Sequence, residues 1–173
     1  MDSNPLRRSV SDTWKFLEAD GLKMPRTTEG EPLVRSTMPS IYDEEPLSFS
    51  FFRTGVEAAD FSNMSLPRTF FGRSTFVGVN FRNTDLAESR MCWNDFESCD
   101  FSGADLSRCD MRASNFNGCM FVGAVLTGAD IRRSSFEDCD FTGAMVNGAV
   151  AEDEDAIGCV QDYLEGEQQA VMA

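Results

Sequence analysis

A large apolar residue recurs at every fifth position from Phe51 to Val146, and the register never slips over these 20 positions. Eleven of the 15 phenylalanines of the chain occupy them. The residue two places earlier is small, namely Ala, Ser, Thr or Cys, with three exceptions: Met64, Val79 and Asn94. A period of five fits neither an α-helix nor a flat β-strand. It predicts a chain that turns a corner every five residues and points one large and one small side chain inward on each side.

A second period of 20 residues divides the large positions into four columns. One column is phenylalanine throughout, and another is leucine with a final valine: Phe61, Phe81, Phe101, Phe121 and Phe141; Leu66, Leu86, Leu106, Leu126 and Val146. Four columns predict four sides per coil, so the repeat predicts about five coils. Stacked at the β-sheet spacing of about 4.8 Å, five coils form a rod roughly 24 Å tall.

The units CDFSG (99–103), ADLSR (104–108) and CDFTG (139–143) show the pattern at its clearest. It runs as a small residue, Asp or Asn, Leu or Phe, and two variable positions, and in this it resembles the pentapeptide-repeat family. The resemblance covers residues 49–150. It implies an all-β fold, a right-handed quadrilateral β-helix, in agreement with the four columns.

The two ends depart from the repeat. Residues 1–48 are expected to form an N-terminal capping segment, with a helix from Ser11, its N-cap, to Gly21. Four prolines then predict an extended stretch: Pro25, Pro32, Pro39 and Pro46. Residues 151–173 form an acidic C-terminal tail, in which Ile157, Val160 and Leu164 could cover the last coil. Cys159 continues the 20-residue spacing of Cys99, Cys119 and Cys139.

Residue types that carry catalysis are scarce. The chain has no histidine, which removes the commonest general base and most zinc sites. Four cysteines fall on the small inward position, where they are expected to fill space: Cys99, Cys109, Cys119 and Cys139. Cys92 is predicted to point outward and to be the one accessible thiol of the repeat. The periodic aspartates are expected to accept backbone hydrogen bonds at the corners. We therefore expect no enzyme activity, no cofactor and no metal.

Long apolar segments are also missing. No run of 18 apolar residues is present, so we expect no contact with a membrane. The first residues have no apolar stretch of the kind found in a signal peptide. Six cysteines without such a signal indicate a reducing, cytoplasmic location.

Outward positions offer the candidates for binding. Trp93 lies in a column with Arg53, Arg73, Ala113 and Arg133, and tryptophan beside arginine is typical of interface hot spots. Apolar residues replace polar ones near the last coils. The predicted partner-binding residues are Arg73, Trp93, Arg133, Met120, Val122, Val125 and Met145. Contact of the apolar ones with the terminal segments is an equal alternative.

The family resemblance implies two alternative protein partners. The resemblance to quinolone-resistance proteins of the family implies a DNA mimic that binds DNA gyrase. The net charge of -14 suits this role, but half of it lies on the tail, and residues 49–150 hold 13 acidic and 9 basic residues. The acidic balance also argues against direct nucleic-acid binding. The segments YDEEPLSFSFFRTGVE (42–57) and LPRTFFGRS (66–74) are similar to bacterial pentapeptide proteins of polymorphic toxin systems. That similarity implies an immunity protein that binds a toxin domain, with the gyrase regulator as the alternative.

Overall fold

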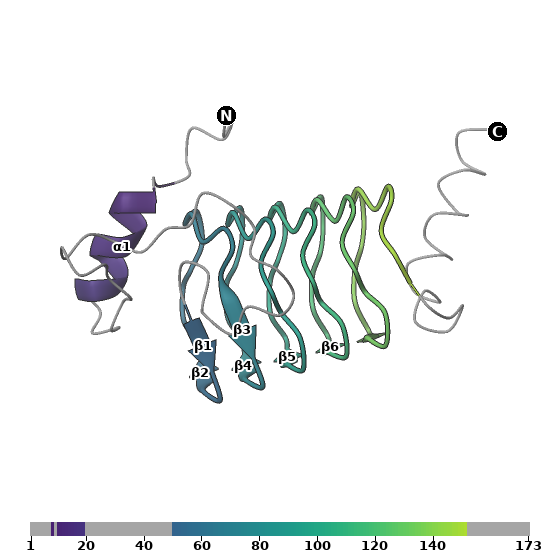
Figure 1. Ribbon diagram of the computed structural model, residues 1–173, viewed down its shortest axis with the longest axis horizontal. Coiled ribbons are helices and arrows are strands. Elements are labelled where there is room, and N and C mark those ends of the chain that lie inside the picture. The colour runs from purple at the N-terminus through teal and green to yellow at the C-terminus, as the bar shows by residue number, and fades with distance from the viewer. Residues whose placement is uncertain (1–7, 9, 20–49, 152–173) are drawn as a thin grey trace.

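The protein is a four-sided β-solenoid with a helix at its N-terminal end (Figure 1). The computed structural model describes residues 8, 10–19 and 50–151. The helix α1 spans Val10–Ala19. Seven short strands follow: β1 (Ser50–Phe52), β2 (Gly55–Glu57), β3 (Phe70–Gly72), β4 (Thr75–Val77), β5 (Asp95–Glu97), β6 (Asn115–Asn117) and β7 (Ser135–Glu137).

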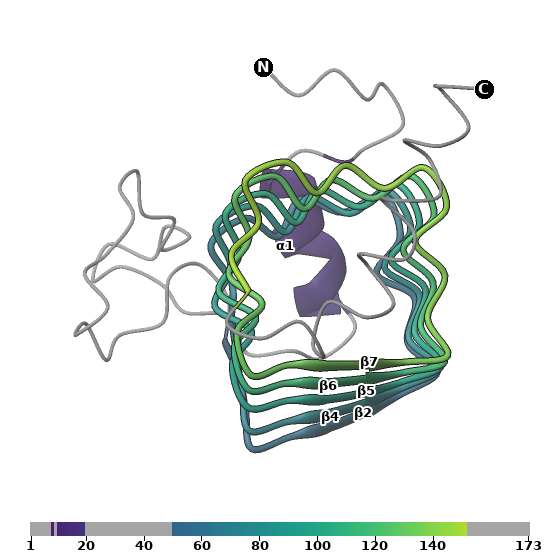
Figure 2. The same ribbon diagram turned by 90° about the vertical axis from the view of Figure 1, so that its right-hand side faces the viewer.

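All strand pairs are parallel and join residues 20 apart. One sheet has the order β2-β4-β5-β6-β7, and a second pairs β1 with β3. Isolated parallel bridges continue the same 20-residue offset, for example between Asp60 and Asn80. The five stacked strands from β2 to β7 are separated by four complete turns, against the prediction of about five coils. The predicted right-handed quadrilateral β-helix is confirmed (Figure 2).

We label the four sides of the solenoid by the residues of their first coil. Side A comprises residues 50–53, side B 55–58, side C 60–63 and side D 65–68, each with the residues 20, 40, 60 and 80 positions later. The small inward residue directly before each of these ranges is counted with the same side. Strands β2, β4, β5, β6 and β7 lie on side B, and β1 and β3 on side A. Sides A and C are opposite one another, as are sides B and D (Figure 2).

Phenylalanine rings fill the core in two stacked columns. On side B the rings of Phe96 and Phe116 are 4.8 Å apart and nearly parallel, and on side C those of Phe121 and Phe141 are 4.7 Å apart. The two columns meet edge to face, as in the pair of Phe116 and Phe121 at 5.6 Å. Offset stacks and T-shaped pairs are the arrangements that aromatic rings prefer. A ring inside the stack, such as that of Phe116, therefore contacts four others.

Each corner holds a residue in the left-handed region. Thirteen non-glycine residues adopt positive φ, and all lie two places after a large inward residue. The aspartate before the large residue accepts a hydrogen bond from the backbone N–H two residues later. Ser102 donates in this way to Asp100 at 2.9 Å, and Ser107 to Asp105 at 2.9 Å. The predicted role of the periodic aspartates is confirmed at these corners.

The small inward positions of side B form a buried hydrogen-bonded column. The backbone N–H of Ser74 donates to the side-chain oxygen of Asn94 at 3.0 Å, and the N–H of Asn94 donates to Ser114 Oγ at 3.0 Å. Asn94 Nδ2 donates in turn to the carbonyl of Phe71 at 2.9 Å. Asn94, an exception in the sequence pattern, is 1% exposed. Its amide thus satisfies one donor and one acceptor of a neighbouring coil.

Replacing Asn94 by alanine is expected to lower the free energy of unfolding by about 2 to 4 kcal/mol, because it leaves the Ser74 N–H and the Phe71 carbonyl buried without partners. Urea unfolding followed by circular dichroism measures the change. Asn115→Ala is the matched control, since Asn115 directly follows Ser114, the residue one coil after Asn94, and its side chain is exposed. Equal destabilisation by the two substitutions would contradict the role given to the column.

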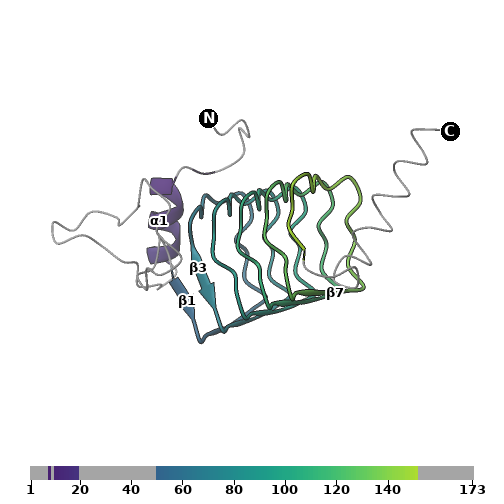
Figure 3. The same ribbon diagram turned by 45° about the vertical axis from the view of Figure 1, so that its right-hand side comes forward.

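The helix α1 lies at the N-terminal end of the solenoid (Figure 3) and across its opening (Figure 2). Thr13 is fully buried, and its hydroxyl oxygen accepts from the backbone N–H of Ser65 at 2.9 Å. Ser65 Oγ donates to the carbonyl of Arg8 at 2.6 Å. The helix begins at Val10, so Ser11 lies within its first turn and the prediction of Ser11 as the N-cap is wrong. The predicted proline segment and acidic tail lie outside the described residues.

Candidate protein-binding face

The charges of the solenoid are sorted by side. Residues 50–151 contain 13 acidic residues, nine arginines and no lysine. Side A carries six of the arginines and two aspartates, which gives a net charge of +4. Side B carries five acidic residues and no basic one: Glu57, Asp95, Glu97, Glu137 and Asp138. Sides C and D are weakly acidic. A positive face therefore adjoins a negative one, although the chain as a whole is strongly acidic.

Side A also presents aromatic side chains to solvent. Trp93 is 65% exposed and Phe52 is 50% exposed. The rings of Phe52 and Phe70 stack at 5.9 Å, and the guanidinium of Arg53 lies 5.2 Å from the centre of the Phe52 ring. Arginine against an aromatic face is a favourable cation–π contact. Exposed aromatics interleaved with arginines are the composition found at the centres of protein interfaces.

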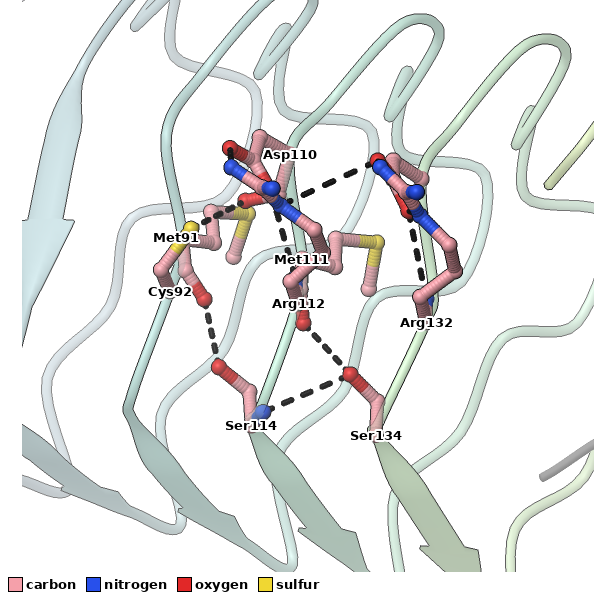
Figure 4. A network of polar contacts seen from close by, with 9 residues as sticks. Met91, Cys92, Asp110, Met111, Arg112, Ser114, Arg132 and Ser134 are labelled. Atoms are coloured by element: carbon pink, nitrogen blue, oxygen red, sulfur yellow. Dashed lines mark hydrogen bonds and ion pairs between the residues drawn. The ribbon is translucent and has the colours of Figure 1, made fainter. Parts of the chain in front are cut away.

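Two arginines of side A are held in fixed positions by aspartates (Figure 4). Arg112 donates to both carboxylate oxygens of Asp110, at 2.7 Å each, and Arg132 donates in the same way to Asp130, at 2.8 and 2.6 Å. Arg112 also lies 3.8 Å from Asp130, so the pairs form a continuous ladder along the rod. Burial alone would raise the pKa of Asp110, but hydrogen bonds from Arg112 and Cys92 outweigh it and the pKa is lowered. The two guanidinium groups are therefore pre-oriented.

An open hollow of about 300 Å³ lies at the C-terminal half of side A. It is lined by Cys92, Trp93, Arg112, Ala113, Arg132 and Arg133. The small side chain of Ala113 separates Trp93 from Arg133 in the corner column. The hollow is lined by three arginines and no acidic side chain, so it suits an anionic or hydrogen-bond-accepting group of a ligand.

The backbone of Trp93 is strained. Its φ is +61°, in a region that costs an L-residue about 1 to 2 kcal/mol. Its indole makes no hydrogen bond, ring contact or cation–π contact with the part of the chain that the structure describes. Twelve other non-glycine residues and seven glycines adopt the same conformation at equivalent corners, so the fold accepts many residue types there and does not require a tryptophan. Folding thus does not explain the tryptophan.

The thiol of Cys92 is less available than the sequence predicts. It is half-buried, and its Sγ donates to the carbonyl of Asp110 at 3.5 Å. Burial, together with the carboxylate of Asp110, raises the pKa of Cys92 to about 12, so the reactive thiolate is absent at neutral pH. Cys139 is also partly exposed. The prediction that Cys92 is the one accessible thiol of the repeat is therefore wrong.

The predicted binding residues fall on three sides of the solenoid. Arg73, Trp93 and Arg133 are exposed and share the corner column of side A. Met120 and Val122 lie on side C, opposite. Val125 and Met145 are bridge partners on side D. Met120 and Met145 are exposed, whereas both valines are half-buried. The structure therefore separates the apolar set from the tryptophan.

Several residues of side A escaped the sequence analysis: Phe52, Arg90, Arg112 and Arg132. Grouping the charged residues by their position within the 20-residue coil would have found them, because residues 20 positions apart lie on the same side of the solenoid. Among residues 8, 10–19 and 50–151, no three His, Cys, Asp or Glu side chains converge in a way that could hold a metal ion. No helix in the same described residues has the length and apolar character needed to cross a membrane.

Comparisons with known proteins agree with the geometry. A model described as pentapeptide repeat region matches residues 94–154, and one described as pentapeptide repeats (8 copies) matches residues 57–91 and 74–112. No curated protein matches the chain.

Several solved structures are similar to this chain, and the one from Arabidopsis thaliana shares its fold. A pentapeptide repeat protein from the thylakoid lumen of Arabidopsis thaliana is 26% identical, with a TM-score of 0.59 over 62% of this chain and 75% of that one. Rfr23, a pentapeptide repeat protein from the cyanobacterium Cyanothece 51142, is 20% identical, with a TM-score of 0.46 over 64% and 68%. QnrB1, a plasmid-mediated fluoroquinolone resistance protein, is 19% identical, with a TM-score of 0.34 over 59% and 53%.

The two family models together span residues 57–154, which include most of the solenoid. The chain belongs to the pentapeptide-repeat proteins.

Proposed function

We propose that this protein is a non-catalytic binding scaffold that uses side A to hold a bacterial toxin domain inactive, as an immunity protein. One observation carries the proposal. Trp93 is 65% exposed in a strained conformation, at the rim of an arginine-lined hollow. A side chain that adds strain and has no described partner is accounted for by an interaction outside the fold.

The rigidity of side A supports tight binding. The Asp110–Arg112 and Asp130–Arg132 pairs hold two guanidinium groups in place, and the β-ladder fixes the backbone beneath them. A surface that is already ordered loses little conformational entropy when it binds, so more of the contact energy remains as affinity. An inhibitor that must outcompete a toxin's substrate needs such affinity.

The charges on sides A and B indicate which charge distribution a partner protein should have. A protein that contacts the corner between sides A and B meets arginines on one side of Trp93 and five carboxylates on the other. The partner should therefore carry an acidic patch beside a basic one. Such a split pattern selects one orientation and rejects proteins of uniform charge. A nuclease-type toxin has a basic substrate-binding surface, and side B and the acidic tail suit that surface. We further propose a cytoplasmic location with reduced thiols.

A DNA-mimicking regulator of DNA gyrase is the second candidate. The absence of basic residues from side B within residues 55–138 favours it, because a mimic needs unbroken negative charge. Only five acidic residues lie there, however, and the adjoining side A is positive. Negative charge that imitates duplex DNA would cover more than one side of the solenoid. We therefore place this candidate after the toxin.

Co-purification from the native host, followed by growth assays, tests the proposal. We expect a toxin domain that stops growth when it is expressed alone and is neutralised by co-expression of this protein. Recovery of gyrase, with inhibition of supercoiling by the purified protein, would replace the first candidate by the second. Recovery of a partner whose toxicity the protein does not suppress would overturn the inhibitory role and leave only the binding scaffold.

A further inference from the structure

Three thiols stand in one column on side C. Cys99, Cys119 and Cys139 occupy the small inward position of three consecutive coils, two places before Phe101, Phe121 and Phe141. Cys99 and Cys119 are buried and Cys139 is partly exposed. No other column of the described solenoid holds neighbouring thiols: Cys109 on side A lies between Ser89 and Ala129.

The three side chains share one orientation. Each Sγ donates to the carbonyl 23 residues earlier, Cys99 to Phe76 at 3.3 Å, Cys119 to Phe96 at 3.5 Å and Cys139 to Phe116 at 3.5 Å. Identical contacts in successive coils place the sulfur atoms one coil apart, at the β-spacing of about 4.8 Å. The adjacent rings of Phe121 and Phe141, with centres 4.7 Å apart, show this spacing directly.

The thiols also interact with one another. Proximity to the thiol of Cys119 lowers the pKa of Cys99 and that of Cys139, whereas the thiols of Cys139 and Cys99 raise the pKa of Cys119. The central sulfur is thus within reach of both neighbours.

We propose that Cys119 and one neighbouring thiol of this column form a two-coordinate site for a thiophilic metal ion such as Hg(II). Soft thiolates select soft ions. Two metal–sulfur bonds in line, each near the 2.3 Å found for zinc thiolates, span about 4.6 Å, which matches the coil spacing. Zinc itself needs four ligands in a tetrahedron, which a straight column does not supply.

Binding of the metal ion requires no oxidant or reductant. Two thiols each lose a proton to solvent, and the two thiolates bind one divalent ion, so the product is neutral. Neutrality matters because an uncompensated charge in the core would be costly. The partly exposed Cys139 gives the ion a way into the column. The two weak S–H hydrogen bonds that are lost belong to the poorest class of protein donors.

Titration of the reduced full chain with mercuric chloride in excess glutathione tests the site. All variants carry Cys159→Ser, so that only the described thiols of the column remain. We expect one ion bound per chain and a rise in Tm on binding. In glutathione the two displaced glutathione thiolates take up the protons, so the release of two protons per ion is measured in a parallel titration without glutathione. X-ray absorption should show two sulfur ligands. Glutathione removes ions held by single thiols, so retention reports the paired site.

The column predicts a specific pattern among single substitutions. Cys119→Ala should weaken retention at least about 100-fold, because Cys99 and Cys139 are then two coils apart and no pair remains. Cys99→Ala and Cys139→Ala should each retain the ion, since each leaves one adjacent pair. Cys109→Ala is the matched control at the same inward position and should behave as the parent. Alanine already occupies this column at Ala59, so these variants are expected to fold.

Two outcomes overturn the site. Undiminished retention in Cys119→Ala would show that the ion is held elsewhere. Equal loss in Cys119→Ala and Cys109→Ala would show that the effect comes from general loosening of the core. Neither outcome bears on the binding of a protein partner by side A, which rests on different residues.

Discussion

Replacing Trp93 by glycine is expected to weaken the complex with the partner protein at least about 30-fold, a loss of roughly 2 kcal/mol that is typical of a hot-spot tryptophan. The same substitution should leave the folded protein as stable as before or up to about 1 kcal/mol more stable. Glycine adopts a φ of +61° without the steric cost that tryptophan bears there. Binding and stability should therefore move in opposite directions, which is the signature of a side chain kept for an interface.

Ser98→Gly is the matched control for this change. Ser98 lies five residues further along, at the next corner, with a φ of +52° and an exposed side chain. It should relieve the same strain and leave the affinity unchanged. Calorimetric titration against the partner recovered from the host gives the Kd, and urea unfolding gives the stability. Loss of more than about 1 kcal/mol of stability in Trp93→Gly would show that the indole packs within the fold and is not a binding anchor.

The solenoid itself could be predicted from the sequence because its period leaves few alternatives. A large apolar residue at every fifth position and a 20-residue column period require a four-sided coil, and the parallel pairing of Phe96 with Phe116 follows from that spacing. The helix was predicted, but it begins at Val10 and not after Ser11. The role of Asn94 could not be predicted, because its side-chain amide hydrogen-bonds to a carbonyl 23 residues earlier and to an N–H 20 residues earlier.

The candidate face could be predicted only in part. The column of Trp93, Arg73 and Arg133 follows from the period. The cationic character of side A does not follow from the net charge. The charge of +4 on side A is hidden in the total by the negative charge of the other three sides. The ladder of Arg112 and Arg132 depends on side-chain rotamers that bring each guanidinium back onto the aspartate two residues before it. Sequence spacing alone does not specify that contact.

Phe116→Ala is expected to lower the free energy of unfolding by about 3 to 5 kcal/mol. Substitutions in the interior should destabilise the fold far more than substitutions on its surface. Phe116 is fully buried, stacks on Phe96 at 4.8 Å and on Phe136 at 4.9 Å, and meets Phe101 and Phe121 edge to face. Its removal leaves a cavity that neighbouring coils cannot close, because each coil is fixed by hydrogen bonds to the coils above and below.

Urea unfolding followed by circular dichroism measures this cost, and Tm should fall by about 10 °C or more. Phe116→Leu refills most of the volume and should cost roughly 1 to 2 kcal/mol, as volume-conserving changes do. Phe52→Ala removes the same ring from a position that is 50% exposed and should cost less than about 1 kcal/mol. In a solenoid each coil contacts only its neighbours, so a cavity between β5 and β7 weakens the link between the two halves of the rod. If Phe116→Ala were no more destabilising than Phe52→Ala, the stacked rings would not be the main source of stability, and the backbone ladder would have to supply it.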